Sequence, residues 1–467
     1  MVKDKKHKEQ EYQKIHLKIL EKIVPTQQER EKLKQQFQAM TQEIAQTLEE
    51  NNIQAEIELT GSFARDTWLA GNRDLDIFVI LPYTSKLSPE DILSVIKEHF
   101  DLPWEKKHAQ HPYLATIKEG LDIEIIPCYE YQPGRPLRSP MDRSPRHTKF
   151  VTNNLPTGRE ADVRLLKQFM RGIGTYGAEI AIKGFSGYLL ELLVIYYEGE
   201  FLRVLKNAPS LPGAILTFEE KQKVKKEDFQ DDAFIVVDPT DEQRNVAAAV
   251  SEETLAEFIA AATRYLKHPS EAFFFPEITR NRKEMLEQLQ KTPLQVTILH
   301  HSRPEIVDDV LWGQIRKFEE SLHHFLEEEK MQPITVDSLV KEGQIFTVIV
   351  SQKNMLPTFQ WRKGPPVGNR GQEQFLQKYQ KYPRVVYGPV VMNKRWRVLL
   401  KNLPLELDRV IIQAIQQQKI ALPSYLQLAK EQIRLIVQRE ELLIVAARDQ
   451  ALLKFLYKTM RGKPLYL

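Results

Sequence analysis

Two aspartates that open a strongly apolar run are the residues of this chain best suited to chemistry. Asp74 and Asp76 begin the segment DLDIFVI at residues 74–80. Because side chains alternate along a β-strand, we expect both carboxylates on one face, with Leu75 and Ile77 on the other. Carboxylate oxygens are ligands that Mg²⁺ prefers. The pattern therefore predicts a Mg²⁺ site at the start of a buried strand.

A second predicted strand supplies further acids. Residues 121–126 read LDIEII, so Asp122 and Glu124 share a face in the same way. A site that binds two metal ions needs a third carboxylate, and a nearby acid can help to accept a proton from an attacking hydroxyl. The residues alone give Asp122 and Glu124 similar claims to this role, and an ordinary solvated strand face is the alternative for either.

A Gly-Ser pair precedes the first acidic strand. Gly61 and Ser62 follow a strand-like run at residues 55–59, and Ser62 is placed to start a short helix that contains Arg65 and extends through Trp68. The start of a helix offers free N–H groups and a partial positive charge, which suit a phosphate. The turn, the helix and the paired acids together match the signature of nucleotidyltransferases of the DNA polymerase β superfamily.

The elements that must position these residues are partly visible in the pattern. A T-x-x-E capping box at Thr26 starts a helix that we expect to pack on the catalytic sheet. Residues 127–156, rich in Pro, Arg and Ser, predict a long irregular connection. Residues 161–173 predict a helix with a basic stripe of Arg164, Lys167 and Arg171, which either holds phosphates or is a solvated face.

Further along the chain, Ser186 is expected to cap a buried helix. A second capping box at Thr240 predicts a helix that contains Arg244 and continues through Val250. Strand-like runs at 295–300 and 344–351 flank a long amphipathic helix at 306–328, a βαβ order that predicts a small α/β domain.

Composition limits the class of protein. With 467 residues, 42% of them hydrophobic and 28% charged, the chain predicts a soluble protein of two to four domains. The single cysteine, Cys128, excludes an intramolecular disulfide and a cysteine-based zinc cluster. Because the sequence lacks an apolar stretch of membrane-spanning length and a signal peptide, we expect a cytoplasmic location and no membrane partner.

Positive charge is concentrated locally. The net charge of +3 is too small to indicate nucleic-acid binding by itself, but residues 361–410 contain 11 Lys/Arg against 3 Asp/Glu. Aromatic residues are interleaved with this charge: Trp361, Phe375, Tyr379, Tyr382, Tyr387 and Trp396. The segment fits backbone and stacking contacts to RNA, with a basic surface around a small hydrophobic core as the alternative.

Seven sequence blocks resemble one family, the archaeal-type, class I CCA-adding enzymes, which are tRNA nucleotidyltransferases. They span most of residues 55–265, in the family's order: GSFARDTWLAGNRDLDIF, AQHPY, IEIIPCY, DRSPRH, VRLLKQFMRGIGTYGAE, GFSGYLLELL and VDPTDEQRNVAA. The resemblance implies an α+β multidomain protein with a polymerase-β-like head that contains a mixed β-sheet. It divides the chain into a catalytic head (1–150), a helical neck with base and triphosphate contacts (151–267), an α/β body (268–355), and a basic tail with C-terminal helices that bind tRNA (356–467).

The resemblance also implies roles for individual residues. Asp74 and Asp76 would bind the metal ions, with Glu124 as the third acid. The family usually has Asp at that position, so the longer side chain leaves Asp122 as the alternative. The residues implied at the nucleotide are Ser62, Arg65, Lys167 and Tyr176 at the triphosphate, His111 and His147 near the sugar and phosphates, and Arg244 at the base. The two histidines rest on the resemblance alone.

The implied function is template-independent addition of C, C and A to the 3′ end of tRNA. CTP and ATP would be the substrates, Mg²⁺ the cofactor and pyrophosphate the by-product of a two-metal mechanism. Three alternatives stay open: a poly(A) polymerase-like enzyme, an enzyme that adds only CC or only A, and an RNA-binding protein that has lost catalysis. The oligomeric state, monomer or homodimer, is also open.

Overall fold

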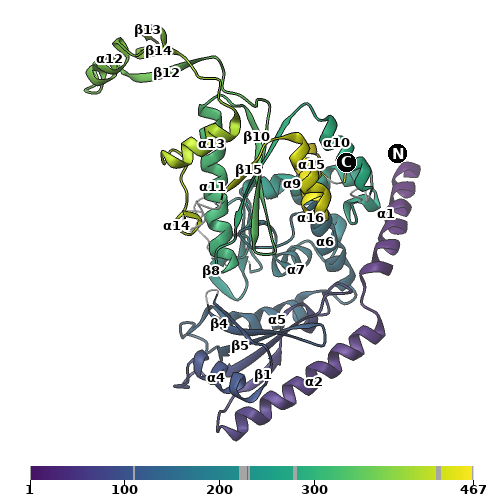
Figure 1. Ribbon diagram of the computed structural model, residues 1–467. Coiled ribbons are helices and arrows are strands. Elements are labelled where there is room, and N and C mark those ends of the chain that lie inside the picture. The colour runs from purple at the N-terminus through teal and green to yellow at the C-terminus, as the bar shows by residue number, and fades with distance from the viewer. Residues whose placement is uncertain are drawn as a thin grey trace. The chain divides into compact units, whose positions relative to one another are not determined.

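The computed structural model describes residues 2–108, 111–219, 229, 232–276, 281–427, 433–464 and 466–467. The chain forms two compact units, Met1–Glu277 with Pro464–Leu467, and Ile278–Lys463. Both units combine helices with sheets (Figure 1), which confirms the expected mixed α+β class. Within the described residues, none of the helices has the length and apolar character needed to cross a bilayer.

A five-stranded mixed sheet carries the predicted acidic strands. Its order is β1-β2-β5-β4-β3, in which β2 and β5 are parallel and the other neighbours are antiparallel. The strands are β1 (Glu56–Leu59), β2 (Asp74–Leu81), β3 (Glu105–His108), β4 (Pro112–Lys118) and β5 (Leu121–Tyr129). The predicted strands at 74–80 and 121–126 are thus confirmed. They pair with each other in parallel within the sheet.

The helices of the first unit divide between this sheet, which α2 and α4 cover, and a second apolar core. They are α1 (Val2–Ile23), α2 (Gln27–Glu50), α3 (Gly61–Ala64), α4 (Pro89–His99), α5 (Ser144–Asn154), α6 (Glu160–Ile173), α7 (Gly187–Tyr196), α8 (Phe201–Asn207) and α9 (Glu252–Lys267), with 3-10 turns η1 (Pro140–Arg143), η2 (Ala208–Ser210) and η4 (Glu271–Phe273). The Thr26 capping box of α2 is present, as predicted. Leu33, Met40 and Ile44 of α2 pack with Leu75 and Ile77 of β2, so this helix does cover the sheet.

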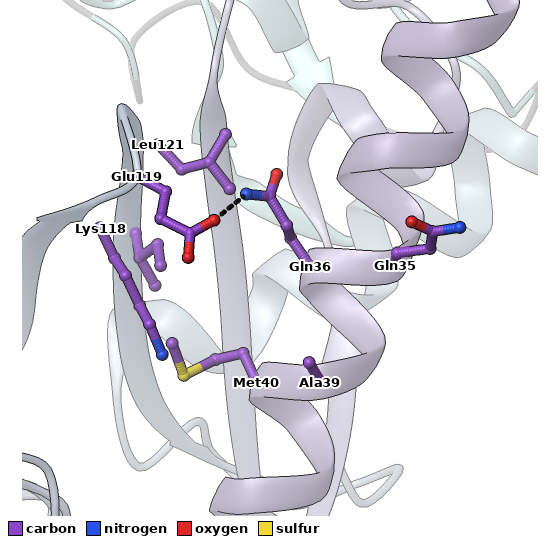
Figure 2. Close-up of a pocket in the computed structure, with 8 residues that line it drawn as sticks. Gln35, Gln36, Ala39, Met40, Lys118, Glu119 and Leu121 are labelled. Atoms are coloured by element: carbon purple, nitrogen blue, oxygen red, sulfur yellow. Dashed lines mark hydrogen bonds between the residues drawn. The ribbon is translucent and has the colours of Figure 1, made fainter.

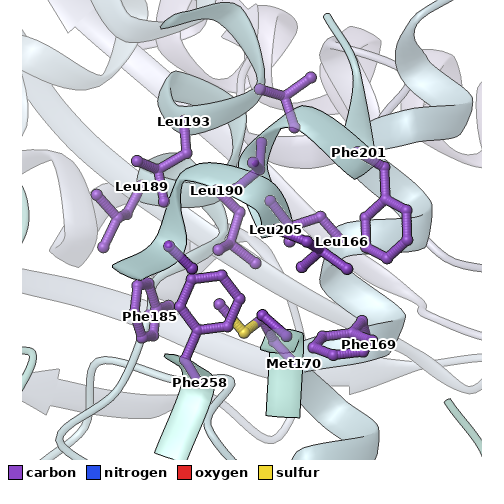
Figure 3. Packing of buried hydrophobic residues seen from close by; sticks show 14 of the residues in the cluster. Leu166, Phe169, Met170, Phe185, Leu189, Leu190, Leu193, Phe201, Leu205 and Phe258 are labelled. Carbon is purple, nitrogen blue, oxygen red and sulfur yellow. The ribbon is translucent and has the colours of Figure 1, made fainter. Parts of the chain in front are cut away.

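A larger apolar core lies among α6, α7, α8 and α9. Leu166, Phe169, Phe185, Leu189 and Phe258 are each fully buried there (Figure 3). The predicted Ser186 cap of α7 is confirmed, because its side chain accepts a hydrogen bond from the Leu189 N–H. Residues of α1 also join this core. The packing fixes α6 and α7 against each other and so fixes the polar side chains that they carry.

Two local predictions in the first unit are wrong. The helix after the Gly-Ser turn ends at Ala64 rather than Trp68, because the chain turns at Asp66, whose φ is 51°. Residues 127–156 are not an irregular connection: β5 continues to Tyr129, and η1 and α5 follow. The Asp142 carboxylate organises this segment by accepting hydrogen bonds from the N–H groups of Tyr129 and Ser139, a long-range contact that composition does not reveal.

The helix predicted from the Thr240 capping box is also wrong. A three-stranded sheet of order β6-β7-β8 occupies this region, with β6 (Ile215–Leu216), β7 (Ile235–Asp238) and β8 (Asp241–Asn245). Asp238 accepts hydrogen bonds from both the N–H and the hydroxyl of Thr240, which uses the expected capping side chain in a turn. Arg244 therefore lies on a strand.

The second unit is built on a four-stranded sheet of order β10-β11-β9-β15. Its strands are β9 (Gln295–Ser302), β10 (Pro333–Lys341), β11 (Gln344–Ser351) and β15 (Arg434–Ile436), and its helices are α10 (Arg282–Lys291), α11 (Asp308–Glu328), α13 (Leu407–Gln416), α14 (Ser424–Gln427), α15 (Arg439–Arg448) and α16 (Gln450–Arg461). All neighbouring strands are antiparallel. The two predicted strands and the helix between them are present as β9, α11 and β11, but they do not form a simple βαβ unit, because β10 intervenes after α11 and β11 pairs antiparallel to β9.

The predicted basic segment forms a separate small sheet within the second unit. Its order is β12-β14-β13, with β12 (Phe359–Pro366), α12 (Gln372–Gln380), β13 (Val385–Met392) and β14 (Arg395–Lys401). Trp361 and Tyr387 meet edge to face on this sheet and remain exposed, at 38% and 57%. Unlike core aromatics, these two rings are available at the surface.

Candidate active site

The predicted acids gather on one face of the central parallel pair. In the register of β2 and β5, Asp74 lies opposite Asp122 and Asp76 lies opposite Glu124. Strand alternation places all four side chains on the face away from Leu75 and Ile77, which belong to the α2 core. Asp74 and Asp122 are exposed, whereas Asp76 and Glu124 are partly buried. The strand pairing therefore brings together the acids that the sequence singled out.

The electrostatics of this edge favour a cation. Burial, and secondarily the charge of Asp122, raise the pKa of Asp74 above its ordinary value, while Arg171 opposes them. Burial and the charge of Asp74 likewise raise the pKa of Asp76, against the effect of Arg65. Both carboxylates would thus be stabilised in their charged form by an added positive charge.

Gly61 keeps space open beside the Asp76 carboxylate. Its φ is +70°, and a Cβ at this position would stand 1.9 Å from Asp76 Oδ2. Within the described part of the chain, no three His, Cys, Asp or Glu side chains already converge as a metal-binding group. Mg²⁺ needs no such cage, since it usually takes one or two carboxylates and completes its shell with water and substrate phosphates. The paired aspartates fit that mode of binding.

A cavity of about 250 Å³ adjoins Asp76. Its lining also includes Arg65 at the end of α3, His147 of α5 and Tyr188 of α7. The Arg65 guanidinium donates a hydrogen bond to Thr148 Oγ1 at 3.1 Å. Ser62 lies in the same short helix as Gly61, next to this wall. A separate hollow of about 480 Å³ is lined by Asp74, Asp122 and Glu124.

Two cations of the basic stripe on α6, among them the predicted triphosphate residue Lys167, are buried. Lys167 is 2% exposed and donates to Thr67 O, Thr67 Oγ1 and Glu191 Oε1 at 3.2, 3.0 and 2.9 Å. Arg164 is also buried and pairs with Asp66 at 2.6 Å. Two of the three cations of the basic stripe are therefore not solvated, whereas Arg171 is exposed. Tyr176 is brought close to Lys167: a Cβ on Gly187 would stand 3.1 Å from the Tyr176 hydroxyl and 3.7 Å from Lys167 Nζ.

His147 and Arg244 meet at one buried carboxylate. Asp238 Oδ2 lies 2.9 Å from His147 Nε2 and accepts a hydrogen bond from Arg244 Nη1 at 2.8 Å. Although burial opposes ionisation, these contacts and the Thr240 N–H hold the pKa of Asp238 well below its usual range. Tyr188 stacks on the His147 ring with centroids 4.1 Å apart. The network joins a residue implied at the sugar to the residue implied at the base.

His111 is placed away from these clusters. It is buried, its Nε2 lies 2.7 Å from Pro127 O, and its Nδ1 lies 2.8 Å from Ser139 Oγ. Because a carbonyl only accepts, Nε2 carries the proton and the ring bridges β5 to η1. His111 does not line the cavity beside Asp76. His111 belongs to the AQHPY block, whose first two residues, Ala109 and Gln110, lie outside the described residues.

Another hollow lies on the opposite face of the sheet. It is bounded by Met40 of α2 and by the turn between β4 and β5, where Gln36 donates a hydrogen bond to Glu119 Oε2 at 3.0 Å (Figure 2). Leu121 and Ile123 line it, and these residues alternate with Asp122 and Glu124. The hollow is therefore separated from the acids by the sheet.

Two further residues of the site, Glu191 and Asp238, are not among those predicted from the sequence. Both are fully buried, and each holds two of the predicted cations or histidines. A signal for Glu191 exists, because it is the lone charged residue of GYLLELLVIY, and a charge inside an apolar helix needs a partner. Asp238 carries no comparable signal, since an aspartate before a proline is typical of a turn.

Comparison with known proteins gives a consistent family assignment. Family models match for "tRNA nucleotidyltransferase, second domain" at residues 161–275 and for "CCA-adding enzyme, C-terminal domain" at 293–422. A third, "Second Messenger Oligonucleotide or Dinucleotide Synthetase domain", matches residues 11–139. A solved structure of the Cid1 poly(U) polymerase is 16% identical and covers 56% of this chain and 98% of that one, with a TM-score of 0.45.

Curated relatives cover most of the chain. The CCA-adding enzyme of Pyrobaculum neutrophilum is 37% identical over 81% of this chain and 88% of its own length. That of Methanosarcina mazei is 34% identical over 81% of this chain and 84% of its own length. Together with the domain matches and the acidic strand pair, this similarity shows that the chain belongs to the CCA-adding enzyme family of tRNA nucleotidyltransferases.

Proposed function

We propose that this chain adds C, C and A in turn to the 3′ end of tRNA, using CTP and ATP, releasing pyrophosphate and reading no template. The observation that carries the proposal is the register of β2 and β5, which sets Asp74 and Asp76 beside Asp122 and Glu124. The cavity next to Asp76 contains an arginine that can meet phosphate oxygens. Family membership supports the choice of tRNA as acceptor.

In the proposed mechanism, Asp74 and Asp76 hold two Mg²⁺ ions, with Glu124 as the third acid. Bound there, Mg²⁺ supplies charge neutralisation and lowers the pKa of a coordinated hydroxyl. The acids position the 3′-hydroxyl opposite the leaving pyrophosphate, so most of their effect is orientation. Glu124 is preferred to Asp122 because it lies opposite Asp76 and is more buried, although Asp122 remains the comparison to test.

The phosphate-binding role falls to cations around the cavity. Arg65 lines it directly, whereas Lys167 and Tyr176 lie near each other where both pack close to Gly187. Ser62 lies on the same α3 turn as Gly61 and is proposed to contribute its hydroxyl. Because these groups come from α3, from α6 and from the segment between α6 and α7, we propose that triphosphate binding depends on how α3 packs against the helical neck.

Base choice is assigned to Arg244, which Asp238 holds at a fixed position. A polar pocket discriminates strongly among bases, since a mismatched edge leaves buried donors or acceptors unpaired. His147 is held by the same carboxylate and stacks on Tyr188, and we propose that it contacts the sugar and phosphates. We do not extend this role to His111, whose ring nitrogens are used between β5 and η1.

The RNA-binding role is proposed for the second unit. Its small sheet displays Trp361 and Tyr387, and a neighbouring cavity is lined by Lys378, Tyr382 and Arg384. Basic and aromatic side chains together suit phosphates and stacked bases. The division into head (1–150), neck (151–267), body (268–355) and tail (356–467) is part of this proposal.

The test is to incubate the protein with Mg²⁺ and tRNA that lacks its CCA end, supply CTP, ATP or both, and sequence the product ends. C-C with CTP alone, and C-C-A followed by arrest with both nucleotides, is the expected result. A long adenylate tail would indicate a poly(A) polymerase, and C-C or A alone from the complete mixture would indicate a partial activity. No addition by folded protein would indicate an RNA-binding protein without catalysis.

A further inference from the structure

Glu191 is a buried acid shared by two of the cations that the proposed function places at the triphosphate. It lies on α7 and is 0% exposed. Its Oε1 accepts a hydrogen bond from Lys167 Nζ at 2.9 Å, and its Oε2 lies 2.8 Å from Arg65 Nε. The second contact is an ion pair without hydrogen-bond geometry. One carboxylate thus joins α3, α6 and α7.

The arrangement leaves a net positive charge next to the cavity. Arg65 and Lys167 together carry two positive charges against the single negative charge of Glu191. The Lys167 side chain is 3% exposed, and its three N–H donors are all used, one on Glu191 and two on Thr67. Arg65, by contrast, reaches the lining beside Asp76. Glu191 therefore neutralises one of the two positive charges, while Arg65 lines the cavity in which the nucleotide is proposed to bind.

Burial makes this balance important for Lys167. Burial lowers the pKa of the Lys167 ammonium, and the charge of Glu191 is the largest effect opposing that shift. Arg65 and Arg164 disfavour the ammonium further, and the neighbouring Tyr176 hydroxyl is neutral because burial raises its pKa. Glu191 is itself ionised, since Arg65 and Lys167 outweigh the effect of burial and lower its pKa.

We propose that Glu191 is a positioning residue for nucleotide binding: its carboxylate fixes Arg65 at the cavity and keeps the Lys167 ammonium charged. This inference rests on the proposed function, since it concerns the triphosphate of the same CTP and ATP. Glu191 does not touch the nucleotide in this scheme. It acts through the two cations, so its loss should change nucleotide binding more than the chemical step.

The test uses E191Q and an RNA acceptor that ends in C-C, so that a single adenylate is added. KM for ATP and kcat are measured from about pH 6 to about pH 9, a range in which a lysine with a lowered pKa titrates while arginine stays charged. For E191Q, we expect KM for ATP to rise with pH by about tenfold or more, the size of one lost charge-assisted contact. The wild-type KM should stay flat.

Two further variants separate positioning from a purely structural role. The double variant E191Q/K167M should show a high KM that no longer changes with pH, because the titrating group is gone. E191D keeps the negative charge but shortens the side chain by one methylene, so its KM for ATP should rise without pH dependence. If E191Q does not fold, E191D tests the inference in its place.

Each outcome bears on a definite claim. An E191Q protein that loses activity equally at every pH, or that keeps the wild-type KM, would overturn the inference. A wild-type KM for E191D would do so as well. Failure of the wild-type protein to add adenylate to this acceptor would instead refute the proposed function, so the two failures are distinguishable.

Discussion

Replacing Gly61 with alanine should disable the site through a single methyl group. The Cβ would stand 1.9 Å from Asp76 Oδ2 and 3.0 Å from Asp76 Cγ, well inside van der Waals contact. The carboxylate must therefore move by on the order of 1 Å or rotate away from its position. A displacement of about 1 Å at a reacting centre costs roughly 10²-fold in rate.

The same substitution also carries a backbone cost that must be subtracted. At φ +70°, an L-residue is strained by roughly 1–2 kcal/mol relative to glycine. Gly158 provides the matched control, because its φ is +82° and nothing lies within 4 Å of the Cβ that would be added. Gly158→Ala should lose similar stability while keeping its nucleotidyl-transfer rate.

The assay is single-turnover addition of one nucleotide, with thermal unfolding measured in parallel for both variants. We expect Gly61→Ala to be slower by about two orders of magnitude, with a loss of stability close to that of Gly158→Ala. Equal rates for the two variants would refute the reasoning, because they would show that the space beside Asp76 Oδ2 is not needed.

Three other properties can be checked independently. Burial lowers the pKa of His16 from 6.5 to about 4, so its contribution to stability should be complete above pH 6.5 and be lost as the pH drops toward 4, by roughly 3 kcal/mol at most. In urea titrations, His16→Phe should lose less stability over this range than the wild-type protein. Burial raises the pKa of the Cys128 thiol, so native protein should resist iodoacetamide and unfolded protein should react, as measured by mass spectrometry. Asp238→Asn should raise UTP and GTP misincorporation by about tenfold through release of Arg244, and unchanged fidelity in competition assays would contradict that role.

The acidic edge of the sheet could be predicted from the sequence because its signals are local. Asp74 and Asp76 sit in a run whose other members are apolar, and period-two alternation fixes which side chains share a face. The pairing of β2 with β5 then follows from two matching strands with acids in the same pattern. What the pattern could not provide was the register that sets Glu124 opposite Asp76, since register depends on contacts between distant residues.

The incorrect predictions involve side chains whose partners lie far along the chain or compete locally. The Thr240 hydroxyl matches a capping box, yet Asp238 captures it in the turn before β8. For Lys167, the alternative of a solvated face is wrong, since the side chain is buried against Glu191, 24 residues away, while its phosphate-binding role stays a prediction. A buried ion pair of this kind can be predicted from the sequence only where a charged residue interrupts an apolar helix, as Glu191 does in α7.

The measurement that tests the account most directly is to compare Asp76→Asn with Asp122→Asn for CCA addition and tRNA binding under the same conditions. We predict that Asp76→Asn abolishes addition while tRNA affinity is retained, because the acid holds the metal and not the RNA. Asp122→Asn should remain active, since Glu124 is the proposed third acid. Measurable turnover by Asp76→Asn, or loss of tRNA binding together with activity, would contradict the assignment of the β2 acids as the catalytic centre.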